Sequence, residues 1–470
     1  MMWNFRKYSN EIAVISDKGE RITYQQLDMF AEKLIDNISE RCLVFSLCTN
    51  SVASVVGYTG FINHRIVPLL IDSHMDPDML NSLINEYKPS YLWIPENMAE
   101  MFSEFKSIYS DFSYMLKKTN FDVAYPLYDE LALLLNTSGS TGSPKLVRQS
   151  YSNVESNIKS IVEFLALDES EKPITTLPMN YTYGLSIINS HLYIGATILL
   201  TDKTLMEKSF WSFFKTQEAT SFGGVPYTYE ILDKLRFHRM ELPSLRTMTQ
   251  AGGKLSFNLH KKFAEYAMDT NRDFVVMYGQ TEATARMSYL SSENSLKKCG
   301  SIGVAIPNGK FSLIDTDGNA ITEPEVVGEL VYEGPNVTLG YAQCGDDLSK
   351  DDERNGKLIT GDMAKIDEDG YYYIVGRKKR FLKIFGNRVN LDETESLIKS
   401  QFPGLDCACA GVDDKMYVFV TNDLLIETIK KFISEKTGLN SVAFKVIMID
   451  EVPKNDSGKT LFTRLEQYYD

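Results

Sequence analysis

The chain has 470 residues, of which 43% are hydrophobic and 24% charged, ordinary values for a globular protein with more than one domain. Its 63 acidic residues outnumber its 49 basic ones, and the net charge is −14. That balance argues against a nucleic-acid partner, which needs a positive face. Six cysteines in a chain of this length do not indicate a disulfide framework.

Two further patterns bear on location and on metal binding. Residues 1–7 lack the apolar core of a signal peptide, and no apolar run approaches the roughly 20 residues that span a bilayer. We therefore expect a cytoplasmic protein without a membrane partner. Cys407 and Cys409 are spaced C-x-C, but no second cysteine pair or histidine cluster accompanies them, so we interpret them as free thiols.

Short apolar runs alternate with amphipathic stretches along most of the chain. This alternation favours parallel β-sheets covered by helices. The expected strands are 43–47, 66–71, 91–94, 131–135, 198–200 and 274–278, and the expected helices include 24–38, 77–86 and 259–268.

The pattern changes near residue 309, where shorter apolar segments alternate with Asp-Gly turns. Segments 311–315, 328–332 and 371–375 predict a small antiparallel β unit. A basic, glycine-led segment follows at 376–380, and a β-α-β pattern occupies 416–449. We place a domain boundary at the basic segment, which gives a large domain over 1–376 and a small one over 377–470.

The stretch from Leu135 to Lys145 holds five hydroxyl side chains, two glycines and one lysine directly after an apolar segment. Such a loop can turn its N–H groups and hydroxyls toward a polyanion, and Lys145 adds a positive charge. It is not the common P-loop, because Pro144 precedes the lysine. An exposed linker of small polar residues is the alternative.

Four later segments also carry chemical groups. Thr281 and Glu282 follow an apolar strand, Asp362 follows a glycine, five cations fall within 377–383, and Lys459 lies in a Ser-Gly turn. Taken singly, each has an ordinary interpretation: a helix start, a turn residue, a solvated face and an exposed lysine.

Taken in order, these segments resemble the signatures of the acyl-adenylate-forming (AMP-binding) superfamily, which includes acyl-CoA synthetases, luciferases and peptide-synthetase adenylation domains. Residues 137–145 resemble its TSGSTGxPK loop, 278–282 its YGxTE, 360–362 its TGD, 376–386 its GRxKxxxKxxG and 453–459 its PxxxSGK. Weaker matches are 177–178, 183–184, 252–253, 328–330 and 340–341. The resemblance covers nearly the whole chain and is closest in style to a stand-alone acyl or aryl acid–AMP ligase.

The resemblance implies an α/β fold. A large N-terminal domain of helix-covered β-sheets with a small β-barrel-like unit would be followed by a small, mobile α+β lid domain, with the hinge near Lys379. It also implies a ligase that uses ATP and Mg²⁺ to convert a carboxylic acid into acyl-AMP and pyrophosphate, and then transfers the acyl group to a thiol.

The same resemblance implies a role for each matching residue. Nucleotide binding falls to Thr137, Ser138, Gly139, Ser140, Thr141, Gly142, Lys145, Gly252, Gly253, Tyr278, Gly279, Asp362 and Arg377. Catalysis falls to Lys459, Lys383, Thr281 and Glu282, with Glu282 also the magnesium ligand. Lys459 would act in adenylate formation. Lys383 would act in thioester formation, with Gly386 leaving room for a pantetheine arm.

The acid pocket is expected around the two tyrosines near residue 182. Its predicted members are Tyr181, Tyr183, Gly184, Val225, Tyr227, Gln250, Ala251 and Gln280. No acidic residue occurs in 178–184 to pair with an ammonium group, which disfavours a free α-amino acid. The tyrosines and Gln250 suggest a small, somewhat polar acid, and ordinary aromatic packing is the alternative.

Two departures limit what the resemblance implies. Lys254 stands where relatives usually carry a small or acidic residue, so local nucleotide or substrate contacts are expected to differ. The region after the hinge is short for an acyl-CoA synthetase, which leaves the acceptor open. Compactness, and the absence of a basic run for the 3′-phosphate of CoA, tilts the prediction slightly toward the phosphopantetheine of an acidic carrier protein. That partner needs a positive face, which 377–383 or 430–431 offers.

Other classes of function stay open at this point. An adenylate can also pass to an amine or a hydroxyl, and amino-acid adenylation is a related alternative. A degenerate nucleotide-binding module would have lost Lys145, Glu282, Asp362 or Lys459, yet all four are present. A P-loop hydrolase is disfavoured by the missing Gly-Lys-Ser/Thr.

Overall fold

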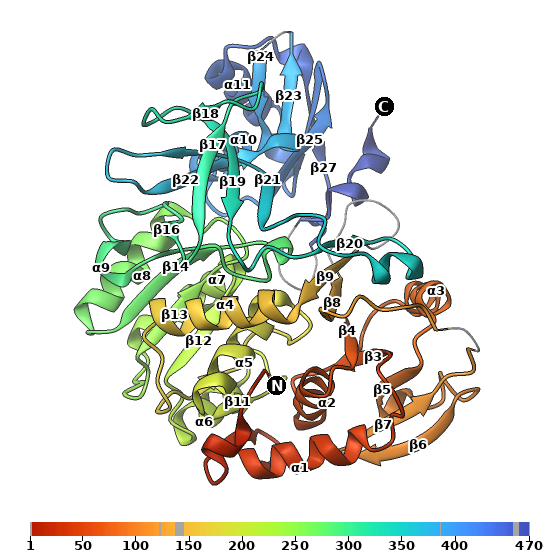
Figure 1. Ribbon diagram of the computed structural model, residues 1–470. Helices are drawn as coiled ribbons and strands as arrows, with labels where there is room; N and C mark the ends of the chain where they lie inside the picture. The colour runs from red at the N-terminus through yellow and green to blue at the C-terminus, as the bar shows by residue number, and fades with distance from the viewer. Residues whose placement is uncertain (1, 122–123, 137–144, 386, 455–459, 470) are drawn as a thin grey trace. The chain divides into compact units, whose positions relative to one another are not determined.

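In a computed structural model, the described residues are 2–121, 124–136, 145–385, 387–454 and 460–469 (Figure 1). They form two compact units. The larger one comprises the described residues of 2–310 together with 333–358, and the smaller one comprises 311–332 and 359–469. The two units, which are divided by their internal contacts, do not meet at the predicted domain boundary of 376/377. That boundary stays a prediction.

The large unit contains two sheets whose central strands are parallel. The nine-stranded sheet runs in the order β16 (Val304–Ala305), β15 (Ser288–Leu290), β14 (Asp273–Tyr278), β13 (Thr247–Gln250), β12 (Ser221–Gly224), β10 (Pro173–Ile174), β11 (Ile198–Leu200), β1 (Ile12–Ser16) and β2 (Arg21–Thr23). Strands β2, β15 and β16 pair antiparallel at its edges. The parallel register between β13 and β14 sets Gln250 beside Val276.

The eight-stranded sheet has the same plan, with parallel centre and antiparallel edges. Its order is β20 (Gly340–Ala342), β9 (Leu146–Ser150), β8 (Leu131–Asn136), β4 (Val67–Asp72), β3 (Leu43–Cys48), β5 (Tyr91–Pro95), β7 (Tyr114–Lys118) and β6 (Lys106–Asp111). The predicted pattern of parallel strands covered by helices is therefore confirmed for the central strands of both sheets.

Helices cover these sheets and fill the space between them. One hydrophobic cluster joins residues of β1, β8 and β11 to α1, α2, α4 and α5, so these helices share a core with both sheets. Helix α2 is apolar on every side, as a helix buried all round must be. The helices of this unit are α1 (Tyr24–Ile35), α2 (Val52–Asn63), α3 (Pro77–Tyr87), α4 (Tyr151–Phe164), α5 (Thr182–Ile194), α6 (Lys208–Thr216), α7 (Pro226–Lys234), α8 (Phe257–Asp269) and α9 (Ser292–Ser295).

Local sequence explains where several helices begin. Ser150 caps α4 and exchanges hydrogen bonds with Asn153, a capping box that satisfies both backbone N–H groups. Ser256 caps α8 in a simpler way. Helix α5 ends at Gly195, whose φ of +83° is the left-handed conformation that favours glycine.

The small unit contains a five-stranded sheet, a hairpin and a three-stranded sheet. Their strands are β18 (Ala320–Ile321), β17 (Lys310–Ile314), β19 (Gly328–Glu333), β21 (Lys357–Ile366) and β22 (Tyr372–Arg377), then β23 (Phe381–Ile384) with β24 (Asn387–Asn390), and β25 (Cys407–Val412), β26 (Lys415–Val420) and β27 (Phe444–Met448). Helices α10 (Leu391–Gln401) and α11 (Ile426–Thr437) accompany the last sheet. Strand β26, α11 and the parallel strand β27 confirm the predicted β-α-β pattern.

Candidate active site

The predicted phosphate and magnesium segment lies where β14 ends. Tyr278 closes the strand, and a short 3-10 helix, η4 (Thr281–Ala283), carries Thr281 and Glu282. The carboxyl end of a parallel strand is where α/β folds bind ligands. Gly279 is required here, because a Cβ on it would lie 1.7 Å from the carbonyl oxygen of Ala285, where the chain folds back.

Glu282 is held in place by side chains from a distant part of the large unit. The Tyr341 hydroxyl donates to Glu282 Oε1 at 2.6 Å, while Arg354 Nη1 donates to the Glu282 carbonyl oxygen at 3.0 Å. Thr338 binds the same carbonyl through its N–H and its hydroxyl. Burial, and then the charge of Glu282, raises the pKa of Tyr341 to about 12, so this phenol stays a donor at neutral pH.

Lys145 belongs to the same group of residues. Its Nζ lies 5.6 Å from the centre of the Tyr341 ring, and the Arg354 guanidinium lies 4.6 Å from that centre. Two residues separated by more than a hundred positions, Lys145 and Glu282, thus meet around one tyrosine. The sequence marked Gly340-Tyr341 only as a weak match, and it gave no signal for Arg354.

Four of the eight predicted acid-pocket residues gather into one apolar cluster. Tyr183, Val225 and Ala251 are buried members, and Tyr181 packs against them with its ring 6.4 Å from that of Tyr183. The Tyr183 hydroxyl shares a 2.7 Å hydrogen bond with Thr249 Oγ1. Burial raises the pKa of both tyrosines to about 12.

Three predicted pocket residues have different surroundings. Tyr227, on α7, is 49% exposed and is not a member of the buried cluster. Gln250 is buried, and its amide Nε2 donates to the carbonyl oxygens of Ala251 and Gly253, at 3.2 and 2.9 Å, so it holds its own turn. Gln280 donates to the Tyr278 hydroxyl at 3.1 Å.

Close backbone approaches explain the predicted glycines. A Cβ on Gly184 would lie 2.3 Å from the Pro178 carbonyl oxygen, and one on Gly252 would lie 2.5 Å from the Tyr181 hydroxyl. Gly252 also has a φ of +83°. A Cβ on Gly253 would meet Pro226 at 3.1 Å. The predicted adenine slot and acid pocket therefore adjoin at Tyr181.

Arg286 is a charged residue of this region that sequence reasoning missed. It is 2% exposed, its Nε donates to Ser186 Oγ at 3.2 Å, and its guanidinium lies 5.3 Å from the centre of the Tyr183 ring. Its Nη1 is buried with no hydrogen-bond partner. Burial lowers the pKa of Arg286 to about 10, which leaves it charged at neutral pH.

A strained turn sends Arg286 inward. Thr284 has φ +65° and ψ −63°, and the Ala285 N–H donates to the Ala283 carbonyl oxygen at 2.7 Å. These values describe the rarer form of γ-turn, which a β-branched residue adopts only when its surroundings enforce it. The enforcing contacts are hydrogen bonds to the Thr284 carbonyl from Gln149 and Thr182, and one from its hydroxyl to the Asn336 carbonyl.

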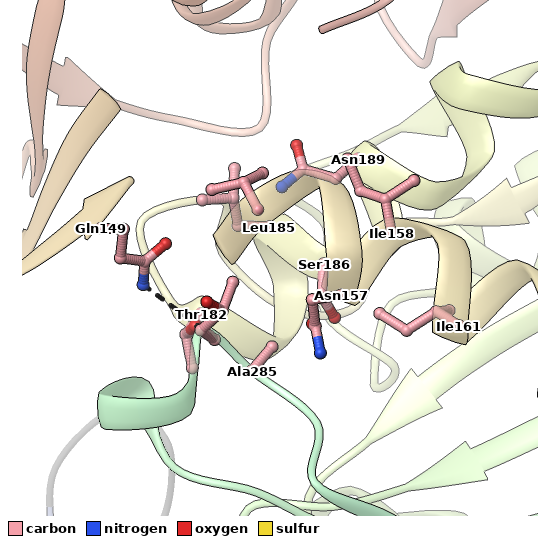
Figure 2. Close-up of a pocket in the computed structure, with 11 residues that line it drawn as sticks. Gln149, Asn157, Ile158, Ile161, Thr182, Leu185, Ser186, Asn189 and Ala285 are labelled. Atoms are coloured by element: carbon pink, nitrogen blue, oxygen red, sulfur yellow. Dashed lines mark hydrogen bonds between the residues drawn. The ribbon is translucent and has the colours of Figure 1, made fainter. Parts of the chain in front are cut away.

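A small cavity adjoins this turn. Figure 2 shows the residues that line it, which come from β9, from α4, from α5 and from the turn itself. Ser186, the partner of Arg286, is one of them, and so is Asn157, whose Oδ1 is buried without a partner. The cavity measures about 10 Å³, roughly enough for one water molecule.

In the small unit, Asp362 and Arg377 face each other across strands β21 and β22. Arg377 Nε lies 3.2 Å from Asp362 Oδ1, and the carboxylate is buried while the guanidinium is exposed. Thr360 fixes the approach, because its hydroxyl accepts from the Asp362 N–H and donates to the Leu330 carbonyl oxygen. This pair brings together the two residues expected at the ribose.

The other cations of the basic segment have mixed surroundings. Lys378 Nζ bonds to Glu329 at 2.6 Å. Arg380 is bound by Asp392 and Glu395. Lys383 is exposed, and its backbone N–H donates to Asp413. Much of the charge in 377–383 is thus neutralised within the unit, so this segment offers an acidic carrier protein less of a positive face than its sequence suggested.

Some predicted site residues lie outside the described part of the chain. They are Thr137, Ser138, Gly139, Ser140, Thr141, Gly142, Gly386 and Lys459. Lys379 lies in η6 (Lys378–Arg380), and its side chain is likewise outside the description.

A family model described as "AMP-binding enzyme" matches residues 2–342. The chain belongs to the AMP-binding enzyme family. Similar curated proteins of this family include an oxalate–CoA ligase of Arabidopsis thaliana, 30% identical over 70% of this chain and 66% of its own length. A 2-succinylbenzoate–CoA ligase of Bacillus cereus is 28% identical over 72% of this chain and 70% of its own length.

The chain matches 63% of the length of another Arabidopsis relative, a peroxisomal OPC-8:0-CoA ligase, with 29% identity. Solved structures match over more of the chain. An o-succinylbenzoate CoA synthetase of Bacillus subtilis, in complex with its acyl-adenylate intermediate, has a TM-score of 0.78, with 21% identity over 97% of this chain and 95% of that one. The ATP-bound MatB of Rhodopseudomonas palustris has a TM-score of 0.79, with 21% identity over 98% of this chain and 96% of that one. At these identities the likeness shows the fold, which is the α/β fold expected.

Three further findings concern membrane helices, metal clusters and cysteines among the described residues. No helix among them has the length and apolar character to cross a membrane. No group of three or more His, Cys, Asp or Glu side chains forms a metal cluster in the same part of the chain. A single carboxylate such as Glu282 fits Mg²⁺, which proteins commonly hold through one or two carboxylates and the substrate's phosphates. Cys407 and Cys409 are free thiols, as expected.

Proposed function

We propose that the chain is an ATP-dependent carboxylic acid ligase, which forms acyl-AMP and pyrophosphate and then transfers the acyl group to a thiol. The observation that carries the proposal is the grouping of Lys145, Tyr341 and Glu282 at the end of β14. It provides a phosphate-binding cation beside an oriented magnesium ligand. Membership of the AMP-binding family supports the same reaction.

In the first step, an anionic carboxylate must approach the α-phosphate of another anion, and positioned positive charge makes this possible. Loop 137–145 binds the β- and γ-phosphates, with Ser138, Ser140, Thr141 and Lys145 as the main contacts. Thr281 contacts the α-phosphate, and Glu282 binds Mg²⁺. Lys459 bridges the carboxylate and the phosphate as charge develops.

The remaining nucleotide contacts are proposed from the matching motifs. Gly252, Gly253 and Tyr278, followed by Gly279, line the adenine slot. Asp362 accepts hydrogen bonds from the ribose hydroxyls, and Arg377 binds the ribose or the phosphates. The buried, fixed Asp362 carboxylate supports its role, since an acceptor held by its neighbours needs no reordering when the ribose arrives.

The second step passes the acyl group to a thiol with Lys383 in the site, after the lid has turned about Lys379. Gly386 leaves space for the pantetheine arm. The names of the similar curated proteins are those of CoA ligases, so we propose CoA as the first acceptor to test. A carrier-protein phosphopantetheine is the second acceptor. A cytoplasmic location also stays a prediction.

The acid binds near Tyr181, Tyr183 and Gly184, with Val225, Ala251 and Gln280 around it; Gln250 shapes the turn beside it, and Tyr227 borders it from the surface. The absence of an acidic side chain in 178–184 disfavours an α-amino acid, since a buried ammonium needs a counter-charge.

The deciding experiment is ATP–pyrophosphate exchange against a panel of carboxylic acids, followed by thioester assays with CoA and with holo-carrier proteins. We expect acid-dependent exchange, AMP as the nucleotide product and a thioester with one of the thiols. Hydroxylamine and amine acceptors in parallel assays test transfer to other nucleophiles. Nucleotide binding without exchange would instead indicate a binding module, and ADP formation would indicate a hydrolase.

A further inference from the structure

Arg286 is a buried cation without a carboxylate partner among the described residues. Its contacts there are the Ser186 hydroxyl and the face of the Tyr183 ring. The two titratable side chains affected by its charge are Tyr183 and His191. Both are neutral at pH 7, because burial raises the pKa of Tyr183 to about 12 and lowers that of His191 to about 4. The positive charge is therefore uncompensated in its surroundings.

Such an arrangement is costly in a folded protein. A charge taken out of water needs an opposite charge and a full set of hydrogen bonds, and Nη1 of Arg286 has neither. One hydrogen bond and one ring contact also do not require an arginine, because a methionine of similar length would fill the space. The arrangement is explained if the missing anion arrives with a ligand.

The position of Arg286 indicates which ligand that is. Its guanidinium packs on Tyr183, a member of the predicted acid-pocket cluster, and it bonds to Ser186 at the edge of the cavity shown in Figure 2. Only five residues earlier in the chain, Thr281 is the proposed contact of the α-phosphate, which the reacting carboxylate attacks. The segment therefore carries groups for both ends of one short acid.

We propose that Arg286 binds a second carboxylate at the far end of the acid, so that the substrate is a dicarboxylic acid. This rests on the proposed function, because it names the acid of the same site. The second carboxylate accepts a hydrogen bond from Nη1 of Arg286, while Ser186, whose hydroxyl donates to the Tyr183 carbonyl oxygen at 2.7 Å, holds the guanidinium through Nε.

The test compares matched pairs of acids in pyrophosphate exchange, such as succinate with butyrate and glutarate with pentanoate. We expect kcat/KM for the preferred diacid to exceed that of its matched monoacid by about 100-fold or more, since truncating one partner of a buried charge pair is costly. Arg286→Met should bring the ratio of the two kcat/KM values close to one by lowering exchange with the diacid. Arg286→Lys should keep part of the preference for the diacid. Arg239→Met, which removes an exposed arginine in η3 (Phe237–Arg239), should leave the ratio unchanged.

The ratio between two acids does not depend on how much of a variant is folded. The wild-type ratio also tests the proposal if Arg286→Met fails to fold. Equal or better exchange with monoacids, or a diacid preference that survives in Arg286→Met, would overturn the role of Arg286 while leaving the ligase intact. Thermal stabilisation by each acid is the readout that needs no catalysis. A diacid that stabilises the wild type but not Arg286→Met, with no exchange for any acid, would support the subsite and contradict the ligase.

Discussion

Two arginines, one in each unit, are held in opposite ways, with Arg286 buried and Arg380 mostly buried. In the small unit, Arg380 is bound by Asp392 at 2.8 Å, by Glu395, and by the Cys409 carbonyl oxygen at 2.6 Å, with the Phe462 ring against its face. In the large unit, Arg286 has one hydroxyl and one ring. The first guanidinium is satisfied by its own fold, whereas the second is not.

This difference distinguishes an arginine that stabilises the fold from one that we propose binds a ligand. Arg148 in the large unit extends the first class, because this fully buried residue pairs with Glu353 and donates to the Tyr341 carbonyl oxygen. Among the cations of 377–383, Lys378 is paired inside the small unit and Lys383 is exposed. Substituting a buried arginine that pairs with a carboxylate inside the fold should therefore lower stability. Substituting a buried arginine without such a partner should instead lower activity.

The largest expected effect is on stability, from Arg380→Met. Removing this cation leaves Asp392 and Glu395 without their partner, which should lower the free energy of unfolding of the small unit by about 3–5 kcal/mol. Arg286→Met should change the stability of the large unit by less than about 1 kcal/mol, or raise it, because no carboxylate is left behind.

Urea unfolding separates the two units in this experiment. All three tryptophans, Trp3, Trp93 and Trp211, lie in the large unit, so their fluorescence follows that unit, while circular dichroism follows both. Equal losses of stability in Arg380→Met and Arg286→Met would remove the distinction between the two arginines.

The next effect is on rate, from the two lysines that have separate steps. Lys459→Ala should lower acid-dependent pyrophosphate exchange by about 10²–10³-fold, the usual cost of a lost transition-state donor, yet still consume supplied acyl-AMP when thiol is present. Lys383→Ala should show the reverse pattern, and Lys436→Ala, which removes an exposed lysine of α11, serves as the control. Normal exchange by Lys459→Ala would refute its assignment.

A smaller rate effect is expected for Tyr341→Phe. The variant keeps the ring beside Lys145 but loses the 2.6 Å hydrogen bond to Glu282, and a hydrogen bond to a charged group contributes about 1.5–3 kcal/mol. Pyrophosphate exchange should fall about tenfold or more, and the Mg²⁺ concentration for half-maximal rate should rise. An unchanged Mg²⁺ dependence would mean that Tyr341 does not orient the magnesium ligand.

The smallest effect is expected for Lys378→Met. Its partner Glu329 is mostly buried, but the lysine side chain is 56% exposed, so water screens the pair. The loss of stability should be about 1 kcal/mol or less in urea unfolding. A loss as large as that of Arg380→Met would show that partial exposure does not weaken these pairs.

Segments with a regular spacing of apolar residues predicted the strands and helices well, because a repeated apolar pattern indicates the element even where single residues do not fit it. Strand β3 and helix α3 were predicted to within one residue at each end, at 43–47 against Leu43–Cys48 and 77–86 against Pro77–Tyr87. Helix α1 ends at Ile35, three residues earlier than expected. The antiparallel edge strands of both large sheets were not predicted, since strand pairing depends on contacts far apart in the chain.

The site was predicted as far as local motifs reach. Glu282, Asp362 and Lys145 stand in such motifs, and the structure shows a contact for each of them: Tyr341 for Glu282 and Lys145, and Arg377 for Asp362. Arg354 was missed because its role arises from residues more than 70 positions away. Arg286 was missed because an arginine looks exposed in a sequence, and only burial without a counter-charge makes it informative.

The γ-turn at Thr284 has a consequence for how this enzyme could be altered. It holds the backbone between Glu282 and Arg286 in one enforced conformation. If Arg286 binds the far carboxylate, this turn fixes the distance between the two ends of the acid. Exchanging residues 284–286 with those of a relative should then change which acid is preferred and leave the binding of ATP unchanged.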